Sequence, residues 1–298
     1  MDIGPTVHAA APNAVCHSCE SNFTDAGGIR WMGNEEGIMP LPSWGADGSG
    51  GTGPSHEGGR GNPHGAAFMP PSSDAVLREH YWCAPRANAR SQTRLTPPRR
   101  PHTSRFYQNN TQSATKSAKQ LVHNFLTSVG RSANLILNIA PDGTGRIPPS
   151  DVARYQEMGA AIRCLFSKKL AETDPAAPLR MDPRTGEISW RLPTAVSSTN
   201  ISLVIREDQT DGQLIGNYSL SCNHAGAWTP CALGALPGVI PGTLAAGVGH
   251  KRILLLAPAA PLLGVRLTVR SHFATAGQAP ALRDMALYDW GGAVARCV

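Results

Sequence analysis

The spacing of hydrophobic positions between residues 118 and 166 predicts a helix, a strand and a second helix. Five apolar positions from 121 to 129 follow helical spacing, and Gly130 is a typical residue just beyond a helix end. The run NLILNIA, residues 134–140, predicts a short buried strand. Ser150 can cap the second helix, whose apolar face carries Val152, Tyr155, Met158, Ile162 and Phe166. Helix–strand–helix with tight turns is typical of a parallel α/β sheet or barrel.

The pattern changes after about residue 185. The segments ISLVIRED, LIGNYSLSC, KRILLLAP and GVRLTVRS are short β-rich runs separated by Gly, Pro and Asp. They predict a separate β-sandwich. We therefore expect an α/β domain over residues 1–180 and a β domain over 185–298, with the boundary near 171–191.

The first third of the chain is less regular. Residues 8–40 have the pattern of an α/β fragment, in which the polar cluster Arg30–Gly37 would lie in the loop after a strand. Residues 45–66 are glycine-rich and of low complexity, and residues 84–117 contain many arginines and few apolar residues. We expect both stretches to be disordered inserts.

Composition adds little to this picture. Hydrophobic residues make up 41% of the 298 positions, enough for a sizeable core, whereas only 16% are charged. The net charge of +6 comes largely from the arginine-rich stretch. That stretch could bind nucleic acid, but it lacks interleaved aromatic residues and any known module, so we predict no nucleic-acid partner.

The cysteines and the chain start suggest no metal, membrane or export signal. Seven irregularly spaced cysteines show no disulfide framework, and the single C-x-x-C from Cys16 to Cys19 lacks the second pair of a zinc site. No apolar run approaches the roughly 18–20 residues that span a bilayer, and the first residues lack the features of a signal peptide. Four N-x-S/T sequons would permit glycosylation in a secretory compartment.

Three separate stretches resemble one family in the family's own order. They are DAGGIRWMGNEEG at residues 25–37, SVGRSANLILNIAPDGTGRIPPSDVARYQEMGAAI at 128–162, and LVIREDQTDGQLIGNYSLSC followed by GVGHKRILLLAP. All three are similar to glycoside hydrolase family 29, the α-L-fucosidases, in its plant and bacterial α-1,3/4-type branch. The resemblance covers about two-thirds of the chain and leaves residues 45–66 and 84–117 outside it.

This resemblance implies a (β/α)₈ barrel followed by a discoidin-like β-sandwich. It implies a retaining glycosidase that removes terminal α-L-fucose from a fucosylated oligosaccharide or glycoprotein glycan without a cofactor. Retention needs two carboxylates about 5–5.5 Å apart, one as nucleophile and one as acid/base. The family acid/base matches Glu35, while Glu36 matches a variable position and is expected in solvent. Arg30, Trp31 and Asn34 would lie in the sugar site.

The sequence also departs from the family. In PPSSDAVLREHYW a serine replaces the usual Glu, although Asp74, Arg78 and Trp82 remain, and Trp82 is a further candidate sugar contact. The nucleophile is an Asp in a W-F-D-G-type strand end ahead of the acid/base, and neither Asp2 nor Asp25 has that context. We therefore expect a partial barrel, a C-terminal fragment of a fucosidase with little activity of its own.

Two further expectations remain open. The alternative function is a non-catalytic carbohydrate-binding or interaction protein derived from a truncated fucosidase. Full-length relatives are secreted, lysosomal or vacuolar, so one of these compartments is expected. The preferred fucosyl linkage and the oligomeric state do not follow from the residues.

Overall fold

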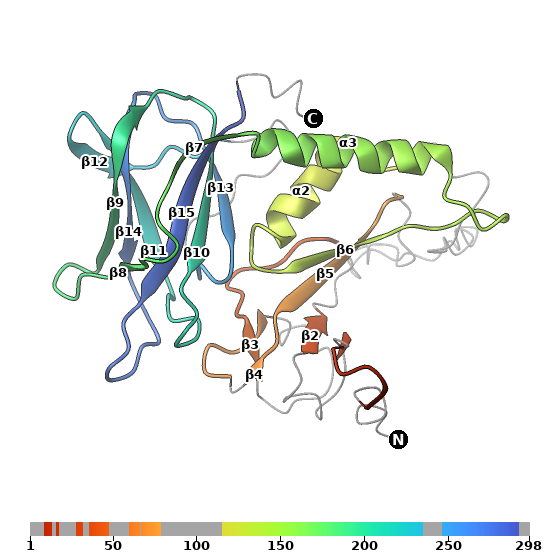
Figure 1. Cartoon of the computed structure of the whole chain (residues 1–298), viewed down its shortest axis with the longest axis horizontal. Coiled ribbons are helices and arrows are strands. Elements are labelled where there is room, and N and C mark those ends of the chain that lie inside the picture. The colour runs from red at the N-terminus through yellow and green to blue at the C-terminus, as the bar shows by residue number, and fades with distance from the viewer. Residues whose placement is uncertain are drawn as a thin grey trace, which may run out of the picture.

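The computed structural model describes residues 9–13, 16–17, 28–31, 36–47, 60–65, 67–78, 115–234 and 246–291. It is mostly β-sheet with few helices, and it combines a parallel sheet with two antiparallel sheets (Figure 1). The disorder predicted for residues 45–66 and 84–117 falls largely outside the described residues. Where these stretches are described they are ordered, because Ala46 pairs with Phe68 and Ser117 caps a helix.

The parallel sheet has the strand order β1-β2-β5-β6. Its strands are β1 (Cys16–His17), β2 (Gly28–Trp31), β5 (Pro71–Val76) and β6 (Asn134–Asn138), with a small antiparallel pair, β3 (Ala46–Asp47) and β4 (Ala67–Phe68), beside it. Helices α2 (Ala118–Ser128) and α3 (Pro149–Leu165) pack against each other and cover one side of β5 and β6 (Figure 1). The predicted helix–strand–helix is confirmed.

Helix α2 begins with a capping box. The Ser117 hydroxyl accepts a hydrogen bond from Gln120 N at 3.2 Å, and Ser117 N donates to Gln120 Oε1 at 2.7 Å. The predicted cap of α3 is wrong. Pro148 is the N-cap residue, and Ser150 lies inside the first turn, where its hydroxyl is 3.1 Å from Asp151 Oδ1.

The prediction that residues 134–140 form a buried strand is right in type and wrong in burial. On β6, Leu135 and Leu137 face the helices, whereas Ile136 on the opposite face is 43% exposed. The cause is that α2 and α3 cover only one face of β6, and no described element buries Ile136 on the other.

The two antiparallel sheets follow directly after α3. One has the order β13-β10-β15-β7, with β8 also paired to β15; the other has the order β12-β11-β14-β9. Their strands are β7 (Lys168–Glu172), β8 (Leu179–Arg180), β9 (Glu187–Val196), β10 (Ile201–Glu207), β11 (Tyr218–His224), β12 (Ala227–Pro230), β13 (Arg252–Leu256), β14 (Leu262–Val269) and β15 (Ala281–Asp289). All four β-rich runs predicted from the sequence contain strands.

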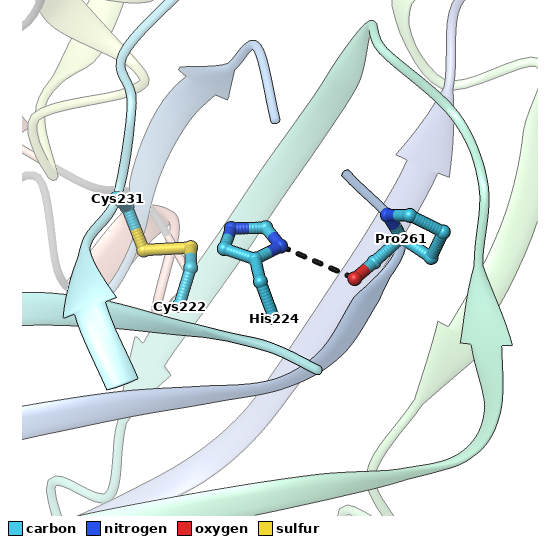
Figure 2. The surroundings of a disulfide bond; sticks show 4 residues. All are labelled: Cys222, His224, Cys231 and Pro261. Carbon is cyan, nitrogen blue, oxygen red and sulfur yellow. Dashed lines mark hydrogen bonds between the residues drawn. A yellow bond between two sulfur atoms is a disulfide. The ribbon is translucent and has the colours of Figure 1, made fainter. Parts of the chain in front are cut away.

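The inward side chains of the two antiparallel sheets form a single apolar core. Its members include Ile205, Leu220, Leu256 and Leu267, all buried. The β13-β10-β15 sheet presents Val204, Ile253 and Leu255 outward to α2 and α3, so one seam joins both parts of the molecule. Cys222 and Cys231 form a disulfide across the β11–β12 hairpin, a pairing that the sequence left open (Figure 2).

A buried carboxylate organises the β side of this seam. Glu207, at the end of β10, accepts hydrogen bonds from Leu214 N and Ile215 N at 2.6 and 2.7 Å, and from Gly249 N at 2.9 Å. The neighbouring Gln213 amide donates to Ser43 O and accepts from Gly45 N, both at 2.9 Å. The seam therefore reaches the segment that follows β2 in the sequence.

Candidate functional site

Arg30 lies inside β2 rather than in a loop after a strand, so that expectation is wrong for Arg30 and Trp31. The Arg30 side chain points away from solvent and the residue is only 8% exposed. Its Nη2 donates to Trp44 O at 2.7 Å, and its Nη1 to Ala46 O at 3.4 Å. A Cβ on Gly61, where φ is +77°, would collide with the guanidinium. Arg30 thus fastens the 44–46 segment to the parallel sheet.

Trp31 joins β2 to the neighbouring strand β5. Its indole Nε1 donates to Asp74 Oδ1 at 2.6 Å, and both side chains are half-buried. In the backbone register Trp31 lies opposite Ser72, two residues before Asp74. The pair therefore lies toward the carboxyl ends of two adjacent parallel strands, the edge where α/β folds place ligands.

The segment that follows residues 32–35 is held firmly against the same edge. Glu36 bridges to Ala75, and Gly37 N donates to Asp74 O at 2.8 Å. The Glu36 carbonyl accepts from Asn124 Nδ2 at 2.6 Å. Gly37 has φ +70°, and a Cβ there would collide with Asn124. The Glu36 side chain is exposed, as predicted.

The predicted acid/base Glu35, together with Asn34 and Trp82, lies outside the described residues, and so do the side chains of Cys16 and Cys19. Of the five predicted site residues, the structure therefore brings Arg30 and Trp31 onto one strand. Both flanks of residues 32–35, Trp31 and Glu36, contact β5.

Helix α2 and the residues just after it hold the backbone of residues 36–39 in place, which the sequence did not predict. Asn124, Thr127 and Ser128 are buried polar residues on one helix face. Thr127 Oγ1 donates to Gly37 O at 3.2 Å, and Arg131 Nη1 donates to Met39 O at 2.7 Å. The spacing of polar residues among apolar ones on a helix was the signal available for this face.

A second missed pair joins the segment just after β5 to α3. Arg78 Nη2 contacts both carboxylate oxygens of Asp151, at 2.9 and 3.0 Å. Asp151 is 1% exposed and lies in the first turn of α3, where a negative charge is favoured. The sequence analysis noted Arg78 but assigned it no partner.

The titratable groups around this edge are shifted mainly by burial. Burial and the charge of Arg131 lower the pKa of His123 on α2. Burial raises the pKa of Tyr155, whose hydroxyl donates to Asn138 O at 3.0 Å at the end of β6. No group of three or more potential metal ligands occurs in the described ranges. No helix among the residues with assigned structure is long and apolar enough to cross a bilayer.

Comparison with known proteins confirms the resemblance to family-29 α-L-fucosidases. The α-L-fucosidase family model matches residues 91–164. This range begins inside the arginine-rich stretch, so the expectation that all of 84–117 lies outside the resemblance is wrong. Alpha-L-fucosidase 1 of Arabidopsis thaliana is 25% identical over 280 residues, which cover 83% of this chain and 47% of the relative. The chain thus spans about half the length of the curated relative that it matches.

Solved structures show the same fold. A protein of Bacteroides thetaiotaomicron described as an α-L-fucosidase matches 97% of this chain and 56% of its own, with a TM-score of 0.68 and 23% identity. A family-29 fucosidase of Ruminococcus gnavus, solved in complex with fucose, matches 89% of this chain and 51% of its own, with a TM-score of 0.59 and 18% identity.

Proposed function

We propose that the chain carries the acid/base side of the sugar site of a retaining α-L-fucosidase, with Glu35 as general acid and base. The observation that carries this proposal is the attachment of both flanks of residues 32–35 to β5. Trp31 bonds to Asp74, and Glu36 and Gly37 bond to Ala75, Asp74 and Asn124. Short, anchored loops at the carboxyl ends of parallel strands carry the chemistry of barrel enzymes.

The other site residues have distinct proposed roles. Trp31 offers an apolar ring to one face of the sugar, and Asn34 and Trp82 contact its hydroxyls and ring. Arg30 is buried and two of its nitrogens donate to backbone carbonyls, so its proposed role is to hold the strand beside the sugar. The substrate is the terminal α-L-fucose of an oligosaccharide or glycoprotein glycan, and no cofactor is required.

The architecture proposed for this function is part of a (β/α)₈ barrel joined to a discoidin-like β-sandwich. It is supported by the parallel order β2-β5-β6, in which α2 precedes β6 and α3 follows it. Two antiparallel sheets around one core support the second part. The likeness to fucosidase structures over nearly the whole chain is consistent with both.

Low turnover is part of the proposal. Double displacement needs a nucleophilic carboxylate beside the acid/base, and the sequence holds no aspartate in the family's nucleophile motif. A general acid alone contributes roughly 10²–10⁴-fold. We expect the purified 298-residue chain to hydrolyse an aryl α-L-fucoside slowly or not at all.

The test separates binding from catalysis. Fucose binding is titrated by calorimetry with the wild type, Glu35→Gln, Asn34→Ala and the matched control Glu36→Gln. We expect weakened binding for the first two variants and no change for the control. Equal effects at positions 35 and 36 would remove Glu35 from the site. Clear turnover of the aryl fucoside that Glu35→Gln abolishes would contradict the low activity and retain the acid/base assignment.

The alternative function is a non-catalytic carbohydrate-binding or interaction protein. The extensive, separately cored antiparallel sheets favour it, because they provide a surface that does not depend on the sugar site. Saccharide binding that survives Glu35→Gln and Asn34→Ala would support this alternative.

A further inference from the structure

Two N-x-S sequons lie at the starts of strands, one on each antiparallel sheet. They occupy residues 200–202 (Asn-Ile-Ser), where β10 begins, and 217–219 (Asn-Tyr-Ser), where β11 begins. In both, the middle side chain enters the shared apolar core, so the asparagine and the serine flank it on the outward side of the sheet. The sequons at Asn22 and Asn109 lie outside the described residues. The two described sequons therefore share a local geometry and differ in what covers them.

The sequon at residues 200–202 lies under the helices. Ser202 is 0% exposed and lies between Leu255 and Tyr288, both of which pack with α2 and α3. Asn200 is half-buried, and its carbonyl accepts a hydrogen bond from Trp290 N at 3.2 Å. Trp290 belongs to the same apolar cluster. Because such packing leaves no spare volume, a bulky group on Asn200 would have to displace it.

The sequon at residues 217–219 lies on the open side of the other sheet. Figure 1 shows β9, β14, β11 and β12 on the side of the molecule away from α2 and α3. Asn217 is exposed and Ser219 is half-buried. Within the described ranges, the Asn217 side chain makes no hydrogen bond. Its amide is therefore available to solvent.

The backbone of Asn217 is held in place although its side chain is free. Asn217 N donates to Ser271 Oγ at 2.9 Å, and its carbonyl accepts from Arg270 N at 2.7 Å. The preceding Gly216 packs closely against the same turn, because a Cβ there would come within 2.6 Å of Ser271 Oγ. A group attached to Asn217 would thus be directed away from the core without disturbing these contacts.

We propose that Asn217 is the site of an N-linked glycan in a chain that enters the secretory compartment, and that Asn200 stays unmodified in the folded protein. The co-reactant is an oligosaccharide joined to a lipid through a diphosphate. Asn217 Nδ2 forms a bond to C1 of the first sugar, the bond from C1 to the diphosphate oxygen breaks, and one amide proton and the lipid diphosphate leave. The Ser219 hydroxyl completes the sequon that the transferase recognises. This modification does not depend on the proposed fucose site.

The transfer must precede folding. In the folded chain the Ser219 hydroxyl lies within a sheet and accepts from Arg270 Nε at 3.1 Å, so it is not available to a transferase. The extended chain presents both sequons equally. Folding then distinguishes them, because a glycan on Asn217 stays in solvent, whereas one on Asn200 opposes the packing of Trp290.

The test expresses the whole chain behind a cleavable secretion signal in eukaryotic cells. Enzymatic removal of N-glycans in heavy-oxygen water converts each modified asparagine to a labelled aspartate, which peptide mass spectrometry locates. We expect the label at Asn217 and none at Asn200 in the secreted protein. Asn217→Gln and Ser219→Ala should abolish the label at this site, and Ser219→Thr should retain it. Asn200→Gln is the matched control and should leave the labelling of Asn217 unchanged.

Two results would overturn the proposal: an unlabelled Asn217, or equal labelling of Asn200 and Asn217 in the secreted chain. If little protein is secreted, the microsomal fraction of the same cells decides the matter, since transfer precedes folding and Asn217 must be labelled there as well. The two Ser219 variants separate enzymatic transfer from spontaneous deamidation, which does not require a hydroxyl two residues later. A label that persists in Ser219→Ala would therefore also contradict the proposal.

Discussion

The two antiparallel sheets and the parallel sheet bury their apolar residues in different ways. The antiparallel pair encloses its core between two sheets, where Ile205, Leu256 and Leu267 are fully or nearly fully buried. The parallel sheet has a small apolar cluster on its helix side, around Leu77 and Leu121, and leaves Ile136 exposed on the other. One region is held mainly by its core, and the other has few apolar contacts with which to hold its shape.

In the parallel-sheet region, side-chain hydrogen bonds and a buried ion pair supplement the few apolar contacts. Arg78 bonds to Asp151, Asn124 bonds to the Glu36 carbonyl, and Gln213 reaches across the seam to residues 43 and 45. Such bonds depend on single partners, whereas a core spreads its contribution over many side chains. We therefore expect the two regions to respond differently to substitution.

The largest effect is expected from Asp151→Ala. Asp151 is almost completely buried against Arg78, and breaking a buried pair by removing one partner costs roughly 3–5 kcal/mol. The variant should lose about that much unfolding free energy, measured by denaturant titration. Hydrogen exchange should locate the loss in β5, β6 and α3.

The matched control is Arg154→Ala on the same helix. The Arg154–Glu157 pair is partly exposed, with side chains 29% and 53% exposed, and pairs at the surface contribute about 0–1 kcal/mol. If Asp151→Ala destabilises no more than this control, the parallel-sheet region does not depend on its buried ion pair.

In the antiparallel region the sensitive position is a core side chain. Leu267→Ala removes a fully buried side chain between the two sheets and should cost roughly 2–5 kcal/mol. The counterpart in the parallel sheet, Ile136→Ser, changes an exposed side chain and should cost less than about 0.5 kcal/mol. Denaturant midpoints measure both. Similar losses at the two positions would mean that the second face of β6 is covered in solution.

Local sequence patterns predicted which helices and strands form in both regions better than they predicted how buried those elements are or where they begin. The apolar spacing at 121–129 predicted α2, and the β-rich runs predicted β10, β11, β13 and β14. Burial of β6 was mispredicted, because an apolar run does not reveal whether one face or both will be covered. Ser150 was mistaken for a cap, because Pro148 and Pro149 start the helix two residues earlier.

The candidate site was predictable only in part for the same reason. The motif identified Arg30 and Trp31, but it could not reveal that Arg30 bonds to the backbone of residues 44 and 46. The partners of the Glu36 and Gly37 carbonyls are Asn124 and Thr127, about 90 residues later in the chain. Contacts between such distant residues depend on the tertiary fold, which short-range spacing does not encode.

Glu207, beside the seam between the regions, should make the unfolding free energy depend on pH. Burial raises the pKa of Glu207 to about 7 from 4.5, against the opposing effect of three backbone N–H groups. Between pH 4.5 and 7 the unfolded chain therefore releases this proton more readily than the folded chain does. The unfolding free energy should fall by up to about 1.4 kcal/mol per pH unit in this window and level off above it.

Glu207→Gln isolates this contribution, because a glutamine side chain does not titrate. The variant is expected to be less stable at pH 5, since its amide replaces an oxygen that accepts from Gly249 N. Its pH profile should lack the fall that the wild type shows between pH 4.5 and 7. Parallel profiles for the two proteins would show that Glu207 has an ordinary pKa in the folded chain.

Apart from the exposed control positions, the smallest effect is expected from Gln213→Ala at the same seam. The Gln213 amide, 6% exposed, bonds to Ser43 O and Gly45 N, and its loss leaves two buried backbone groups without this partner. We expect a loss of about 1–2 kcal/mol. Gln278→Ala, which removes only two exposed, local bonds from Thr275, should cost less than about 0.5 kcal/mol. In hydrogen exchange, the amides of Trp44 and Gly45 should lose protection while β11 and β14 keep theirs. Equal loss of protection in both regions would mean that they unfold as one cooperative unit. The two regions would then differ in how their side chains pack and not in how easily they unfold.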